Sequence, residues 1–168
     1  MRKGVLSACV HASNHPEITT LLLTSLSVLL SKMGINSVKY LKDVLPVLTQ
    51  ALTDPFAGSR PEGLLEGLKC LRDLVLNAWP RMGLKDGHGM EVVGMLVICW
   101  KIVVDAEHDV DKDDKEKDRV LKEVKKEIEV VGRLLVKAIE AIDSGANFKE
   151  ELRPLLTADA GLGSIFGL

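Results

Sequence analysis

The chain has 168 residues and a formal net charge of -2, with 22 basic and 24 acidic side chains. This balance argues against a general nucleic-acid-binding protein, which needs an excess of positive charge. Hydrophobic residues make up 46% of the chain and aromatic residues only 4%, so leucine and valine must fill a core that one domain of this length can bury.

Neither the cysteines nor the apolar stretches indicate secretion or a membrane span. The three cysteines, Cys9, Cys70 and Cys99, are odd in number and widely spaced, which favours reduced, buried thiols in an intracellular protein. The apolar residues 4–10 are too few for a signal peptide and lead to no clear cleavage site. Residues 21–30 are shorter than the roughly 20 residues that cross a bilayer. We therefore expect a soluble protein.

The first helices are predicted from apolar spacing and from the residues that interrupt it. Residues 4–10 look like the last turns of a helix whose beginning is missing, so we expect the chain to be a piece of a longer protein. A second helix is predicted from a cap at Asn14, with Pro16 in its first turn, to Met33, where Gly34 ends it. Its apolar residues lie on most faces, which is typical of a buried helix: Ile18, Leu21, Leu22, Leu26, Leu29 and Met33.

A pair of helices in the middle of the chain has the clearest pattern. The first follows a cap at Ser37, contains Pro46, which we expect to kink it, and stops at Asp54-Pro55. Its apolar residues recur in alternating steps of three and four, as one face of a helix requires: Val38, Leu41, Leu45, Leu48 and Leu52.

The second helix of the pair is predicted from an N-cap at Ser59 and a first turn at Pro61 to Trp79, because Pro80 follows. Since neither helix can bury its stripe alone, we expect the two to face each other and a neighbouring pair. The sequence therefore predicts an all-α, HEAT- or armadillo-like α-solenoid of stacked antiparallel helix pairs, with residues 1–168 as a single domain. The stripe of this second helix is Leu64, Leu65, Leu68, Leu71, Val75 and Ala78.

Two more long helices are predicted in the second half of the chain. Residues 90–105 are rich in β-branched side chains, but their length and their place between helices favour a helix over a strand. Residues 106–118 are predicted to form a charged loop, and residues 117–142 a long amphipathic helix. A short helix at 148–156 precedes an apolar tail that we expect to dock back or to meet a partner: Leu162, Ile165, Phe166 and Leu168.

The residues that could carry chemistry form no convincing site. Cys9, His11 and His15 have a conceivable metal spacing, but there is no second cysteine pair, and Pro16 disfavours a helix at His15. No glycine-rich phosphate loop and no nucleophile with a paired base is visible. The acids of residues 109–118 lack the glycine and the terminal glutamate of a calcium-binding loop. We therefore predict no catalytic, cofactor or metal site.

The central pair of helices resembles a known repeat. The string from Leu45-Pro46 to Asp54-Pro55 is similar to the first helix and turn of a HEAT repeat, and Arg60 with the leucine-rich helix after it is similar to the rest. The turn is longer than usual, and Arg60-Pro61 stands where valine-arginine is common. A longer pattern resembles the C-terminal part of the Tti-two family, over roughly residues 37–104: Asp54-Pro55-Phe56, Pro61-Glu62, Leu76-Asn77, Trp79-Pro80-Arg81 and Cys99-Trp100.

This resemblance implies a non-enzymatic scaffold or adaptor. Members of the Tti-two family are subunits of the TTT co-chaperone complex, which works with the Hsp-ninety machinery on the maturation of PI3-kinase-related kinases. The implied partners are the sister subunits and, indirectly, these kinases and Hsp-ninety, with neither nucleic acid nor membrane. The implied location is the cytoplasm and the nucleus.

Two other classes of protein stay open. One is a generic HEAT-repeat adaptor of the transport or phosphatase-scaffold type, which the identity of its partners would distinguish. The other is an all-helical enzyme, which a bound cofactor or a pocket with several titratable groups would support.

Six residues are candidates for protein binding: Phe56, Trp79, Pro80, Arg81, Trp100 and Phe166. For Phe56, Trp79 and Trp100, packing in the core is the favoured alternative. We predict that Phe56 is largely buried beside the 64–68 side of the next helix. Arg81 should point away from the core, near the last carbonyls of its helix, where the helix dipole favours a cation.

Overall fold

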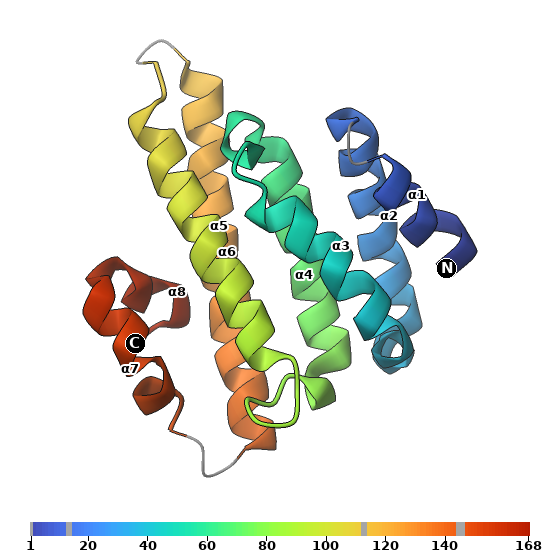
Figure 1. Ribbon diagram of the computed structural model, residues 1–168, viewed down its shortest axis with the longest axis vertical. Coiled ribbons are helices and arrows are strands. Elements are labelled where there is room, and N and C mark those ends of the chain that lie inside the picture. Colours follow the sequence, from blue (N-terminus) through green and yellow to red (C-terminus); the bar gives the residue numbers. More distant parts are fainter. Residues whose placement is uncertain (1, 13–14, 112–113, 144–146) are drawn as a thin grey trace.

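The computed structural model describes residues 2–12, 15–111, 114–143 and 147–168 (Figure 1). Within these ranges the chain forms helices and no strand, which confirms the all-α prediction. Short 3₁₀ turns occur at Gly34–Tyr40, Ala57–Ser59, Trp79–Arg81 and Ala160–Leu162. The α-helices are α1 (Ser7–His11), α2 (Pro16–Met33), α3 (Leu41–Thr53), α4 (Pro61–Ala78), α5 (Gly89–His108), α6 (Lys115–Ile142), α7 (Phe148–Ala158) and α8 (Gly163–Phe166).

The long helices lie in two rows, as a solenoid of helix pairs requires. Helices α2, α4 and α6 form one row, in which α4 packs against both of the others. Helices α3 and α5 form the second row, and each packs on the next helix in the chain, α3 on α4 and α5 on α6. Figure 1 shows these pairs side by side, with the N-terminus at one edge and the C-terminus at the other. The expected stacked antiparallel pairs are therefore confirmed.

The core sits between the two rows and is mostly leucine. The stripes predicted for the central pair are buried almost completely, and each buried leucine is worth about 1.5–3 kcal/mol relative to exposure. Only Val38 and Leu65 are half-buried. The buried members are Leu41, Leu45, Leu48, Leu52, Leu64, Leu68, Leu71, Val75 and Ala78.

The helix ends agree with the sequence in part. Gly34 ends α2 with a positive φ of 54°, which a residue with a Cβ rarely adopts. Ser37 does not cap α3: it lies in a 3₁₀ turn, fully buried, and its hydroxyl has no hydrogen-bond partner among the described residues. Ser59 does not cap α4 either, because its hydroxyl donates to the Phe56 carbonyl at 2.7 Å. The cap predicted at Asn14 lies outside the described residues.

Helix α2 differs most from the expectation. Leu23, Leu26 and Leu30 are buried against the rest of the row, but the opposite face of the helix is open to solvent. The prediction of a fully buried helix was wrong because, among the described residues, α2 packs mainly on α4 and leaves its other face exposed. The exposed apolar residues there are Ile18, Leu21, Val28 and Leu29.

The C-terminal part follows the prediction more closely. Helices α5 and α6 form as expected, but they extend into both ends of the charged stretch 106–118. The loop between them is therefore shorter than predicted, and the Asp114 carboxylate caps α6 by accepting from the Lys117 N–H at 3.0 Å. The tail docks back on α6 through α8. Leu162, Ile165 and Phe166 are buried as expected, whereas Leu168 is 42% exposed.

Candidate protein-interaction surface

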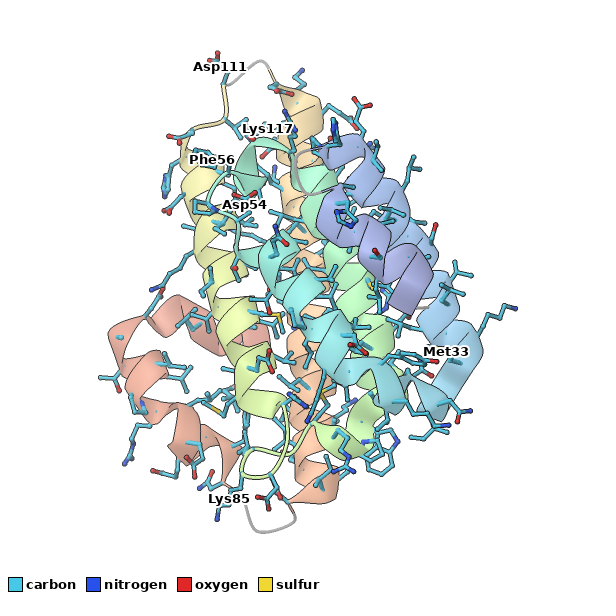
Figure 2. The ribbon with its side chains drawn as sticks, turned by 45° about the vertical axis from the view of Figure 1, so that its right-hand side comes forward. Met33, Asp54, Phe56, Lys85, Asp111 and Lys117 are labelled. Atoms are coloured by element: carbon cyan, nitrogen blue, oxygen red, sulfur yellow. The ribbon has the colours of Figure 1, made fainter. Side chains whose placement is uncertain are left out.

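Phe56 lies in the turn between α3 and α4 and is 81% exposed, so the prediction that it is buried was wrong (Figure 2). The turn itself explains this. Gly58 is the buried residue there, and it packs so closely on α5 that a Cβ would lie 2.9 Å from the Ala106 Cβ. In addition, an Asp54 carboxylate oxygen accepts the Phe56 N–H at 2.9 Å, which holds the turn in shape. Phe56 is therefore available to a partner.

The end of α4 is also exposed. The helix stops at Ala78, and Trp79, Pro80 and Arg81 form a 3₁₀ turn on the surface. Trp79 is 44% exposed, so it is not packed in the core, the alternative favoured for it from the sequence. Arg81 is exposed, and among the described residues its side chain makes no hydrogen bond or ion pair, although its carbonyl accepts the His88 N–H at 2.8 Å.

The two remaining aromatic candidates have structural contacts. Trp100 is half-buried on α5, and the Lys125 ammonium of α6 lies 5.2 Å from its ring centroid. Lys125 also pairs with Glu107, so the three side chains join α5 to α6. Phe166 is buried and meets Phe148 edge to face, with ring centroids 5.5 Å apart. Phe166 therefore holds the tail in place and does not face a partner.

A groove of about 1020 Å³ lies at the open edge of the molecule, between α1, the first half of α2, the second half of α3 and the start of α4. We call it the α2–α4 groove. Half of its lining residues are exposed, so it is open to solvent. Its wall includes Ile18, Leu21, Leu23, Val47, Ala51, Phe56 and Leu64 among the apolar residues, and Glu17, Asp54, Arg60 and Glu62 among the charged ones.

The charges in this groove are mostly negative and unpaired. Glu17, Asp54 and Glu62 face a single cation, Arg60, and none of them forms an ion pair within the described part of the chain. The ladder contact between Asp54 and Arg60 that a HEAT repeat would show is thus absent there. Helices α2 and α4 also begin here, and each end adds about +0.5 of an elementary charge. The groove remains negative after that offset.

Sequence reasoning missed this groove and the outer face of α2. The residues at the groove come from four helices and a turn that only the fold brings together. The usable signal was the pattern of α2 itself, whose apolar residues lie on most faces. Such a helix is either enclosed by its own chain or covered by another molecule.

The polar chemistry of the chain offers no reactive centre in the described ranges. The three cysteines are free and buried. Burial raises the pKa of the Cys70 thiol far above its usual range and raises the pKa of Cys99 to about 12, so neither is a ready nucleophile. No group of three or more metal-ligating side chains occurs among the residues described, and Cys9, His11 and His15 do not form one.

One stretch passes a test for membrane-spanning helices that uses length and composition only. It is Pro16–Thr53, which has 38 residues. An 18-residue part of it has a mean hydropathy of 1.6, and 17% of that part is buried. This stretch comprises α2, a 3₁₀ turn and α3, and the chain changes direction within it at Gly34. Signal sequences and core helices pass the same test, so it is weak evidence for a membrane span.

Comparison with known proteins gives one match. The model of the Tti2 family matches residues 1–59, a segment that contains α2, α3 and the exposed Phe56 turn. No curated protein and no solved structure matches the chain. The resemblance found from the sequence covers roughly residues 37–104, so the two overlap at residues 37–59. The first 59 residues of this chain are therefore similar to the Tti2 family.

Proposed function

We propose that the protein is a non-enzymatic scaffold subunit of the TTT co-chaperone complex, which supports the maturation of PI3-kinase-related kinases together with the Hsp-ninety machinery. The observation that carries the proposal is the family match over residues 1–59. The matched segment contains half of the large apolar side chains that are exposed in the described part of the chain, including Ile18, Leu21 and Phe56. A scaffold that works by binding other subunits needs such surfaces.

The proposal is tested by co-purification. The tagged protein is expressed with the other two TTT subunits, and bound subunits are identified by mass spectrometry. Retention of at least one sister subunit supports the proposal. If neither is retained by this chain or by a longer form of the protein, the function is wrong, and the partners that are retained would decide for a transport or phosphatase scaffold instead.

Location follows from the same proposal. A subunit that serves these kinases should be present in both cytoplasm and nucleus, and fluorescence microscopy of the tagged protein checks this. Membrane-bound signal in place of this distribution would contradict it.

Surface variants then separate the two exposed turns. Arg81→Glu changes the turn after α4, and Phe56→Ala changes the turn before it. Because both side chains are exposed, circular dichroism and thermal melting should show little change. A chain ending before Gly161 is a poor test, because it removes the α8 residues that cover α6.

A further inference from the structure

The outer face of α2 lies at one edge of the row and is exposed in the described part of the chain. A solenoid face that meets only water is normally polar. Here the apolar residues Ile18, Leu21, Val28 and Leu29 are 37–69% exposed on one side of an 18-residue helix. Their spacing of three, seven and one places them on a common face, as in a helix that packs on another helix.

This face continues into the α2–α4 groove. Ile18 and Leu21 line the groove from α2, and Phe56 lines it from the turn between α3 and α4. Behind them Leu23 and Leu64 are buried and close its floor. The groove thus offers an apolar floor with three exposed apolar side chains beside it, which is the arrangement that receives the apolar face of a helix.

The charges around this apolar surface specify the occupant. Glu17, Asp54 and Glu62 outnumber Arg60, and the groove residues carry no ion pair within the described chain. A bound lysine or arginine would gain a partner there, whereas a bound carboxylate would be repelled. The acidic side chains of the groove therefore favour a bound segment that has basic residues beside its apolar residues.

We propose that the α2–α4 groove and the adjoining outer face of α2 bind a basic amphipathic helix of a partner protein. The apolar face of that helix packs on Ile18, Leu21 and Phe56, and its lysine or arginine side chains pair with Glu17, Asp54 and Glu62. The helix extends the row beyond α2 in the way that α4 follows α2. This inference deepens the proposed function and rests on it only for the identity of the partner.

The probe is a synthetic helical peptide with leucines at helical spacing and flanking lysines, labelled for fluorescence anisotropy. Two control peptides share its design: one has glutamate in place of lysine, and one has the same composition in scrambled order. The basic amphipathic peptide should bind at least tenfold more tightly than either control. Its affinity should also fall as salt is added, because part of the attraction is between charges.

Matched variants locate the binding site. Ile18→Ser should weaken binding about tenfold, which corresponds to 1.4 kcal/mol. Ile98→Ser is the control, because Ile98 is exposed to a similar extent, 45% against 49%, but lies on α5 outside the groove. The double variant Glu17→Gln, Glu62→Gln removes two acidic side chains of the groove. It should lose most of the preference for the lysine peptide over the glutamate peptide. The matched pair Glu123→Gln and Glu140→Gln changes two exposed acids of α6 and should leave that preference intact.

Other occupants give different results. Equal binding by Ile18→Ser and Ile98→Ser, or equal binding of the lysine and glutamate peptides, overturns the proposal. So does self-association in analytical ultracentrifugation that Ile18→Ser abolishes while the peptide does not compete, because the occupant is then a second copy. Flotation with neutral phosphatidylcholine vesicles that depends on Ile18 and Leu21, without peptide binding, would assign the surface to a membrane and likewise overturn it.

Failure here and failure of the proposed function are distinguishable. If the wild-type protein retains sister TTT subunits and the groove variants retain them equally well, the function stands and the surface is elsewhere. If no TTT subunit is retained but the basic peptide binds in the groove, the surface stands and the partner belongs to another assembly.

Discussion

The two edges of the helical row differ in how the apolar outer side of the edge helix is covered. At the C-terminal edge, the outer side of α6 is covered by the tail, whose Ile165 and Phe166 are buried. Gly132 of α6 makes this possible, because a Cβ there would overlap the Ile165 carbonyl oxygen. At the N-terminal edge, the outer side of α2 is apolar as well, but no described element covers it.

This difference separates stability from function. An apolar edge that the chain covers itself contributes to folding, whereas an apolar edge left open contributes little to folding and is free for binding. Side chains of the same type should therefore have opposite roles at the two edges. Substitutions there can break or sharpen this comparison.

At neutral pH, the largest expected effect is the loss of Phe166. Phe166→Ala removes a ring that is 3% exposed and meets Phe148, so it should lower the free energy of unfolding by about 3 kcal/mol. Leu21→Ala at the open edge, where the side chain is 69% exposed, should change it by less than about 0.5 kcal/mol. Urea unfolding followed by circular dichroism measures both, and similar losses in the two variants would contradict the comparison.

A smaller effect is expected where the tail meets α6. Gly132→Ala places a methyl group against the Ile165 carbonyl and should cost about 1–3 kcal/mol by forcing α8 away. Gly94→Ala in α5 is the matched control, because no atom lies within 4 Å of a Cβ there. That change should raise the free energy of unfolding by about 0.5–1 kcal/mol, because alanine is more favourable than glycine inside a helix. If both glycines respond alike, the close approach of α8 is not what holds the tail.

The buried thiols predict a loss of stability at alkaline pH. Burial raises the pKa of Cys70 and Cys99 in the folded chain, so the folded state holds protons that the unfolded state releases. Their stabilising contribution is complete below the unfolded pKa near 9 and falls as pH rises from there toward 12, by about 1.4 kcal/mol per thiol and pH unit. In the double variant Cys70→Ala, Cys99→Ala, the free energy of unfolding should fall less steeply as pH rises above 9. An unchanged slope between pH 9 and 11 would count against it.

The smallest effect is expected at the ion pair between α4 and α6. Arg72 contacts Glu127 at 2.5 Å, yet burial raises the Glu127 pKa more than Arg72 lowers it. The folded protein therefore accommodates the protonated Glu127 side chain better than the carboxylate. Because the folded pKa lies above 4.5, the contribution of Glu127 to the free energy of unfolding falls as pH rises through that pKa. Glu127→Gln should be harmless at pH 7, within about 1 kcal/mol, and relatively less favourable at pH 4. Thermal melts at both pH values test this, and a variant much weaker at pH 7 than at pH 4 would reverse the sign.

Much of the fold could be predicted because the apolar spacing repeats locally. The stripe of α4 from Leu64 to Ala78 is a property of neighbouring residues, and the structure buries it as expected. The fate of Phe56 could not be predicted in this way. It depends on Gly58 packing against Ala106 of α5, a contact between residues 48 positions apart in the sequence. The exposed face of α2 was missed for a related reason, since an apolar pattern does not say which molecule covers it.

The central place of α4 in its row has a consequence for how the molecule folds. Helix α4 packs on α2 and α6, which lie at the two edges of its row, and a short turn joins it to α3. It can therefore form its contacts with α3 before α2 or α6 is in place. We expect the α3–α4 pair to be structured in the folding transition state and the two edges to form later. In the folded state, amide hydrogens of α4 should then exchange most slowly, and those of α2 should exchange through local opening that leaves the rest of the row intact. A segment that opens by itself can adjust its shape to an incoming helix without unfolding the protein.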